Sequence, residues 1–333
     1  MTPRGRRTKM GIMKNLLKLS AAFALAFTLT SCQPTSTKPQ AAEKPLSHYQ
    51  DKLAETLADP KARLNLIAKV LGTTEDGERH AYLKFHIYGF AGDGNVEPLF
   101  SMNNYVIQDW KTEDGTEYEV SHREVAYYSK FDSTEPISEF ENPFTGETIE
   151  LPPFVLGPVP RFYSIDPAVE RISFDSDPLN ITMIGDRVYV PTLTIIKFPN
   201  QMTPEEWGAY SNGDSTFWDS MVVYSAEAAD VFDPDKTHVD AEIHMQNLVS
   251  WSPYFKMGQN PGRTMARAYG QHINGFEDLP TDIRENLKKY TPEIFDENWT
   301  EMRIDSVELV QDLQAKRQAG TLDIDQELSL IHI

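Results

Sequence analysis

Three histidines lie in stretches whose alternating residue pattern is typical of β-strands: His86, His122 and His244. Imidazole titrates near neutral pH, so a histidine beside a bound molecule can accept or donate a proton. Arg123 and Arg263 could hold an anionic or carbonyl group nearby, because a guanidinium donates parallel hydrogen bonds. These five side chains are the candidate catalytic residues. A purely structural role is the alternative for each of them.

A second group of side chains could line a binding site for a small, partly apolar ligand. Aromatic rings with a polar tip combine apolar contact area with a hydrogen bond. A loop at 251–263 places several large apolar residues around prolines and glycines, and such a loop covers either the mouth of a pocket or the bottom of the fold. The candidate ligand-binding residues are Tyr82, Tyr88, Tyr128, Trp251, Tyr254 and Arg267.

The motifs of several common enzyme classes are missing from the sequence. It contains no H-E-x-x-H, no G-x-S-x-G, no G-x-x-x-x-G-K-[ST] and no G-x-G-x-x-G. The pairs His238/Asp240 and Glu242/His244 each share one face of a predicted strand, but isolated pairs are more typical of a protein surface than of a metal site. We therefore expect no metal and no cofactor.

The scaffold that must position these side chains is predicted to be mainly β. Runs with strand character are joined by turns of hairpin length, and no alternation of strands with helices occurs. An antiparallel meander of about ten strands must close or stack to protect its edges, so we expect a barrel or a strongly curved sheet. The main predicted strands are 80–89, 99–110, 118–130, 148–151, 179–184, 187–198, 216–225, 239–251 and 263–273, with a Gly185-Asp186 hairpin turn.

Two of these strands carry a face that mixes aromatic and polar side chains. In the strand 80–89 this face holds Tyr82, His86 and Tyr88, opposite an apolar face. In the third strand Tyr118, His122, Glu124 and Tyr128 share one face. Such a face lines either a polar interior or a solvent-exposed surface rich in tyrosine, and both interpretations stay open.

Helices are predicted at both ends of the domain. Residues 47–71 have apolar residues at helical spacing, and Asp59-Pro60 should divide this stretch in two. Two further helices are expected at 281–290 and 306–318. The complete prediction is a mainly β (α+β) fold with flanking N- and C-terminal helices.

The first 31 residues have the composition of a secretory signal. Six basic residues and no acid precede an apolar run that is too short to span a membrane, and Leu29-Thr30-Ser31-Cys32 resembles the lipobox of bacterial lipoproteins. We expect Cys32, the only cysteine, to carry the lipid (diacylglycerol with palmitate), which would leave no thiol for catalysis or a disulfide. The alternatives are an ordinary cleaved signal or a twin-arginine signal at Arg6-Arg7.

This signal predicts a lipid-anchored protein of the bacterial cell envelope, on the periplasmic face of the inner or outer membrane or on the cell surface. Residues 32–46 would then be the lipidated cysteine and a disordered tether, and 47–327 a single β-rich domain. The last six residues, 328–333, resemble a translated sequencing adapter, and a native apolar tail is the alternative.

The charge of the chain limits its partners. The formal net charge is −19, and it falls to −25 without the six basic residues of the signal. No basic patch is visible, so we expect no binding of nucleic acid. The expected partners are the membrane, through the lipid on Cys32, and a small-molecule ligand.

Three motifs together resemble a known family. They are Ser121-His122-Arg123-Glu124, the turn at 141–147 (ENPFTGE) and the segment 251–263 that begins Trp-Ser-Pro-Tyr-Phe. Their order and spacing resemble those of domain of unknown function 1838, over roughly residues 65–275. No motif between about 156 and 238 contributes to the resemblance. Because the function of this family is not established, the resemblance implies no catalytic residue.

Two hypotheses for function follow. The first is a binding module, in which a barrel-like domain holds a small, partly apolar ligand. The second is an enzyme of the isomerase, cyclase or hydrolase type that uses a histidine and an arginine in the same cavity. Binding is favoured slightly, because no catalytic motif is visible.

Overall fold

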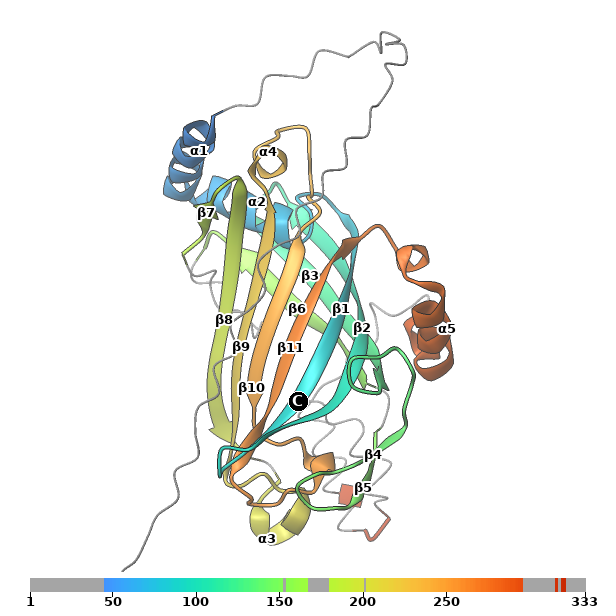
Figure 1. The fold of residues 1–333 in the computed structure, drawn as a ribbon. Helices are drawn as coiled ribbons and strands as arrows, with labels where there is room; N and C mark the ends of the chain where they lie inside the picture. The colour runs from blue at the N-terminus through green and yellow to red at the C-terminus, as the bar shows by residue number, and fades with distance from the viewer. Residues whose placement is uncertain are drawn as a thin grey trace, which may run out of the picture. The chain divides into compact units, whose positions relative to one another are not determined.

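Nine antiparallel strands form one sheet that curls into a half-barrel (Figure 1). The strand order is β6-β3-β2-β1-β11-β10-β9-β8-β7, so the two ends of the sheet stay open. The computed structural model describes residues 45–151, 154–166, 180–200, 202–295, 315–316 and 319–321. Cys32, most of the tether, most of the predicted helix 306–318 and the segment 328–333 lie outside the described residues.

The sheet is built from long strands. A separate two-stranded sheet, β4-β5, follows β3 in the chain. The bounds are β1 Gly77–Ala91, β2 Val96–Glu113, β3 Glu117–Ser129, β4 Glu139–Glu141, β5 Thr148–Glu150, β6 Phe154–Ser164, β7 Thr182–Ile184, β8 Arg187–Pro199, β9 Ser215–Glu227, β10 Glu242–Val249 and β11 Gly262–Ile273.

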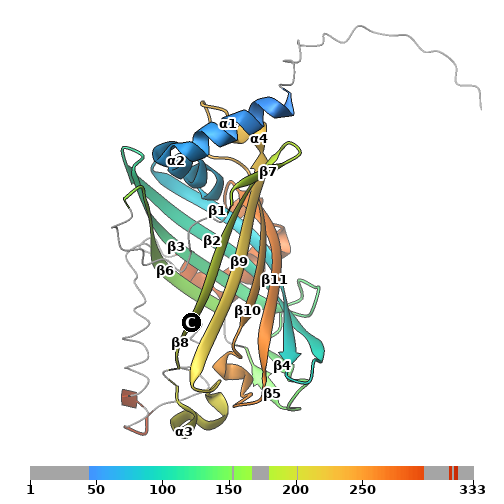
Figure 2. The ribbon, with the colours of Figure 1, turned by 90° about the vertical axis from the view of Figure 1, so that its left-hand side faces the viewer.

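The described helices are short, and two of them lie at one end of the half-barrel (Figure 2). Within the described part of the chain, no helix is both long and apolar enough to cross a membrane. The α-helices are α1 Leu46–Ala58, α2 Pro60–Leu71, α3 Pro204–Trp207, α4 Ala228–Val231 and α5 Thr281–Tyr290, and the 3₁₀ turns are η1 Gly208–Tyr210, η2 Pro253–Phe255, η3 Phe276–Asp278 and η4 Pro292–Phe295.

The predicted fold class is confirmed, with the curved sheet rather than a closed barrel. The predicted break between the N-terminal helices is also confirmed, because Asp59 separates α1 from α2 and its Oδ1 accepts a hydrogen bond from Ala62 N at 2.8 Å. The Gly185-Asp186 turn joins β7 to β8, with Gly185 at φ +62°. The helix predicted at 281–290 is α5.

Strand β6 was not predicted. It contains Gly157, Pro158 and Pro160, which normally interrupt strands. In the structure β6 lies at the edge of the sheet and pairs only with β3. An edge strand tolerates proline because one side of its backbone has no strand to bond.

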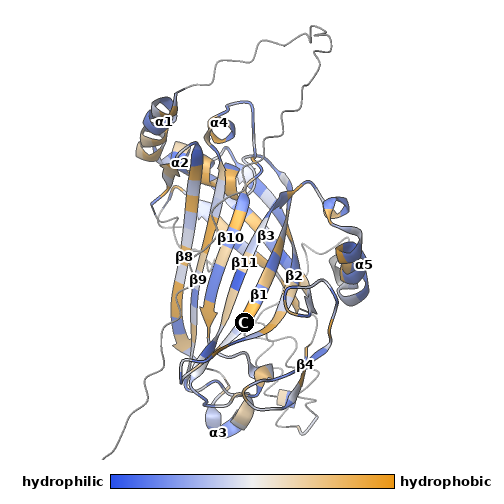
Figure 3. Ribbon diagram, in the orientation of Figure 1, coloured by the Kyte–Doolittle hydropathy of each residue, from blue (hydrophilic) through white to orange (hydrophobic). Residues whose placement is uncertain are grey.

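The concave face of the sheet is identified by side chains that meet across it. Hydrophilic and hydrophobic residues alternate along strands such as β8 and β10 (Figure 3), which separates the two faces. Strands β3 and β8 are far apart in the sheet order, so their side chains can share a cluster only on the concave side. One such cluster, here called the α2 cluster, includes Leu64, Ile67 and Val70 of α2, Trp110, Val120, Val188 and Val190.

A second concave cluster, here called the loop cluster, lies farther along the same strands. It joins residues of β1, β2, β3 and β10 to the segment that follows β10. Its members include Phe85, Phe100, Val106, Tyr128, Ile243, Trp251, Phe255 and Met257.

The convex face of β1–β3 is covered by α5. Ile283 and Leu287 of this helix pack with Tyr105, Ile107 and Tyr127 of the sheet. Tyr105 and Ile107 alternate with the concave residues Val106 and Trp110, as expected for the two faces of one strand.

Candidate functional site

A chain of hydrogen bonds connects polar side chains on the concave face of β2 and β3. Gln108 and His122 are directly paired across the two strands, and Glu124 is paired with Val106. Side chains of paired residues lie on the same face of a sheet. The α2 cluster, which includes Trp110 and Val120, lies at one end of these hydrogen bonds along the strands, and the loop cluster, which includes Val106 and Tyr128, lies at the other end.

The hydrogen bonds fix the protonation of His122. The indole Nε1 of Trp110 can only donate, and it lies 3.1 Å from Gln108 Oε1. The other end of that amide, Nε2, therefore donates to His122 Nδ1 at 3.1 Å, so Nδ1 carries no proton. His122 Nε2 carries the proton and donates it to Glu124 Oε1 at 2.6 Å. The imidazole is held neutral, with both nitrogens bonded.

Glu124 is the end of this chain that reaches solvent. Its side chain is 19 % exposed, compared with 4 % for His122. Burial alone would raise the pKa of Glu124, but the hydrogen bond from His122, the charge of Arg161 and the hydrogen bond from Asn104 outweigh burial and lower it. Asn104 Nδ2 donates to Glu124 Oε2 at 3.0 Å. Glu124 is therefore ionised at neutral pH.

The apolar surface of the loop cluster, which begins at Val106 opposite Glu124, is partly open. Met102, Met245 and Val222 on the concave face are neither fully buried nor exposed. Strand β11 lies between β1 and β10. In the row of Phe85 and Met245 its side chain is that of the small residue Ala268. The ionised Glu124 carboxylate, opposite Val106, thus adjoins a largely apolar surface that continues along β2 to Met102.

Tyr128, Trp251 and Tyr254 belong to the loop-cluster end of the concave face. Tyr128 and Tyr254 interact through their hydroxyls, and burial raises the pKa of Tyr254 to about 12, although the hydrogen bond with Tyr128 opposes the increase. Asn142 of the turn at 141–147 donates to Phe255 O at 3.0 Å and is fully buried. Two of the motifs that resemble the family therefore pack together as a cap on this end of the fold.

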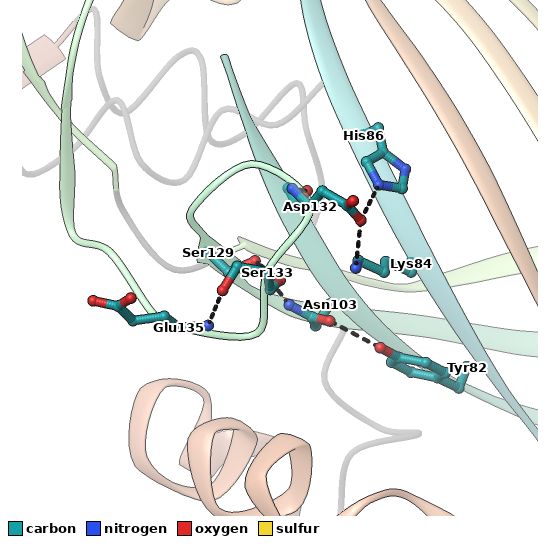
Figure 4. A network of polar contacts seen from close by, with 9 residues as sticks. Tyr82, Lys84, His86, Asn103, Ser129, Asp132, Ser133 and Glu135 are labelled. Carbon is teal, nitrogen blue, oxygen red and sulfur yellow. Dashed lines mark hydrogen bonds and ion pairs between the residues drawn. The ribbon is translucent and has the colours of Figure 1, made fainter. Parts of the chain in front are cut away.

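His86, Tyr82 and Tyr88 lie on the convex face, away from His122. Figure 4 shows that His86 and Lys84 both point to Asp132, with His86 Nε2 at 3.2 Å and Lys84 Nζ at 3.1 Å from its Oδ1. Tyr82 donates to Asn103 Oδ1 at 2.8 Å (Figure 4). The hydrogen bonds from Lys84 and His86 lower the pKa of Asp132, whose side chain is 70 % exposed.

The remaining candidates are also on the convex face. Arg123 pairs with Ile107 of the convex cluster, so it points away from its neighbour His122 and is buried on the other side of the sheet. Arg263 stacks on Phe217, with the guanidinium carbon 4.5 Å from the ring centre. His244 and Arg267 are exposed. Among the five candidate catalytic residues, only His122 reaches the concave face.

Four residues of the site were not among the predicted site residues: Asn104, Gln108, Trp110 and Arg161. Glu124 was assigned to the correct strand face without a functional role. The signal available in the sequence was a run of polar residues inside a strand that has buried aromatic neighbours. No group of three or more histidine, cysteine or acidic side chains suited to a metal ion occurs among the described residues.

Comparison with known proteins gives a family and no characterised relative. No curated protein matches the chain. The family described as protein of unknown function (DUF1838) matches residues 79–306, which extends farther toward the C-terminus than the resemblance predicted from the three motifs. The matched region contains the whole concave polar chain, from Asn104 to Arg161, and both motifs of the cap. The protein belongs to the DUF1838 family.

Proposed function

We propose that the concave face of the half-barrel binds a small, partly apolar ligand whose polar part contacts Glu124. The observation that carries this proposal is the hydrogen-bonded chain Trp110–Gln108–His122–Glu124, which ends at a partly exposed carboxylate between two apolar clusters. Placing an ionised group among apolar side chains costs free energy, and three neighbouring groups, His122, Arg161 and Asn104, are arranged to keep this one charged. Such an arrangement is typical of a site that recognises a polar group in an apolar setting.

Binding fits the geometry better than catalysis by histidine. Both nitrogens of His122 are engaged, so the imidazole positions Glu124 and has no lone pair for a substrate proton. The arginines that were expected to share a cavity with a histidine, Arg123 and Arg263, lie on the convex face.

Acid–base catalysis with Glu124 as the base is the second candidate. The contact of 2.6 Å between His122 Nε2 and Glu124 Oε1 favours it, because a carboxylate oriented by a neutral imidazole is a common arrangement in acid–base sites. In this case Glu124 would take a proton from the ligand, and His122 would be a positioning residue.

The experiment is native mass spectrometry of the full chain purified from its host. We expect a bound small molecule on the wild type and its loss in Glu124→Gln. The matched control is Glu119→Gln, which changes an exposed residue on the opposite face of the same strand. A wild type without a bound molecule, or equal retention in both variants, contradicts the proposal. If NMR shows that the released molecule is converted to another compound, an isomer included, when it is returned to the protein, the second candidate is correct.

The lipid anchor is a separate proposal, supported by the lipobox-like Leu29-Thr30-Ser31-Cys32. An acylated Cys32 would hold the domain beside a membrane of the cell envelope, through a tether that ends at α1. Labelling of cells with a palmitate analogue should mark the wild type and not Cys32→Ala. A labelled Cys32→Ala protein would refute the assignment.

A further inference from the structure

Asn104 has a buried oxygen that the protein leaves without a hydrogen-bond donor. The residue is 1 % exposed, and no donor among the described residues reaches its Oδ1. Its orientation is fixed, because the ionised Glu124 carboxylate accepts only and therefore faces Nδ2 at 3.0 Å. A buried polar atom without a partner destabilises the folded state, so such atoms are rare in folded proteins and call for an explanation.

The atoms at Glu124 and Asn104 that can still form hydrogen bonds are all acceptors. Each carboxylate oxygen receives one donor from the protein, from His122 at Oε1 and from Asn104 at Oε2, and each has room for another. Asn104 Oδ1 shares the amide carbon of the nitrogen that contacts Glu124, so the open acceptors lie side by side. A ligand that satisfies them must offer two neighbouring donors.

The charges at the site argue against an ionic group in that position. An anionic group would face the Glu124 carboxylate and the Asn104 oxygen, both of which repel it. A cationic group would find the charge of Glu124 already compensated by Arg161, which lies close enough to lower the pKa of the carboxyl. Burying an additional charge without a counter-charge is unfavourable. An uncharged pair of donors avoids both costs.

We propose that the ligand carries an uncharged pair of neighbouring hydrogen-bond donors, such as two adjacent hydroxyls, that bind Asn104 Oδ1 and the Glu124 carboxylate while an apolar part lies on Met102, Val222 and Met245. This inference rests on the proposed function, and it specifies the chemistry of the ligand's polar end.

The test compares three probes with the same alkyl chain and different polar ends: 1,2-decanediol, decanoate and decylammonium. Each is titrated calorimetrically into the full chain below the concentration at which it forms micelles. We expect the diol to bind at least tenfold more tightly than either ion. Asn104→Leu should weaken diol binding about tenfold, with little change for the two ions. Gln246→Leu, on the exposed convex face of β10, is the control and should change none of the three.

Glu124→Gln gives an independent reading if Asn104→Leu does not fold. The new amide removes the negative charge that repels an anionic group and can itself donate a hydrogen bond, so decanoate should gain affinity relative to the diol.

Tighter binding of decanoate or decylammonium to the wild type would overturn the inference about the polar end and leave the binding function standing. Equal affinities that do not change in Asn104→Leu or Glu124→Gln would overturn it as well. If no probe binds and no molecule is retained on purification, both this inference and the proposed function fail.

Discussion

The same two strands, β2 and β3, carry a polar network on each face, and the two networks differ in where they end. On the concave face the chain runs from Trp110 to Glu124, and the carboxylate at its end is 19 % exposed. On the convex face Asn103 is fully buried between Tyr82 and Ser129, while the carboxylate of the nearby Asp132 is 70 % exposed. One network ends inside the half-barrel and the other in solvent.

This difference separates a candidate site from a structural brace. The convex network holds the loop after β3 against the sheet: Ser129 Oγ donates to Ser133 O at 2.8 Å, and Asp132 N donates to Ser101 Oγ at 2.9 Å. All of these contacts are used within the protein. The concave network ends at atoms that still accept hydrogen bonds. A histidine beside a carboxylate therefore indicates a site only when the pair also leaves room for a ligand.

The largest expected effect that tests this contrast is that of His122→Ala. The substitution would remove one hydrogen-bond partner from the Glu124 carboxylate and one from the buried Gln108 amide, and each such loss costs about 1–3 kcal/mol. Urea unfolding should show this loss in the free energy of unfolding. The matched variant His86→Ala, on the convex face, should cost much less because its partner Asp132 is hydrated. Equal losses would erase the distinction between the two networks.

The second prediction concerns the acid sensitivity of the concave face. Burial, followed by the charge of Arg79, lowers the pKa of His272 from 6.5 to about 4. The folded state therefore binds fewer protons than the unfolded state in this range, and stability is lost as the pH falls from 6.5 toward 4. The loss can reach about 3 kcal/mol. Urea unfolding between pH 7 and 4 should show a shallower decline for His272→Gln than for the wild type, and equal declines would contradict the prediction.

The third prediction is a moderate effect within the convex network. Tyr82→Phe removes the hydrogen bond to Asn103 Oδ1, and the fully buried Asn103 then lacks one partner. The expected decrease in the free energy of unfolding is about 1–2 kcal/mol. Tyr88→Phe serves as the comparison, because Tyr88 contacts Phe131 with its ring. A decrease of the same size in both variants would mean that the hydroxyl of Tyr82 does not contribute.

The smallest expected effect is that of Asp132→Asn. The carboxylate contacts Lys84 and His86 from a largely hydrated position, so screening by water and salt reduces the value of both contacts. We expect a slight decrease in the urea midpoint at low salt that disappears in concentrated NaCl. A large decrease that persists at high salt would show that the brace depends on this charge.

The alternation of residues along the strands correctly predicted which side chains share a face. It placed Tyr118, His122, Glu124 and Tyr128 together, and the structure has Tyr118 in the α2 cluster and Tyr128 in the loop cluster of the concave face. It also separated Tyr82, His86 and Tyr88 from the apolar residues of β1. The position of His122 and Arg123 on opposite faces follows from the same two-residue period.

What the sequence could not provide was the identity of the concave face. Two strands with similar patterns, β1 and β3, direct their mixed aromatic and polar faces to opposite sides of the sheet. That choice depends on which elements cover each face of the strands: α2, the cap at 251–257 and α5. It also depends on pairings between distant parts of the chain, such as β1 with β11. The residue pattern within a single strand carries no information about contacts with such distant segments.

The sequence by itself determined most of the strands, the edge strand β6 excepted, the helices at 47–71 and 281–290, and the two-residue period that divides each strand into faces. These are local properties, because they arise from backbone geometry and from neighbouring side chains. Only the tertiary structure decided that His122 and Glu124 face inward while His86 faces outward, and that Asn104, Gln108 and Arg161 complete the concave chain. The physical reason is that a site is made by the curl of the whole sheet, which brings together side chains whose separation in the chain carries no signal of their proximity.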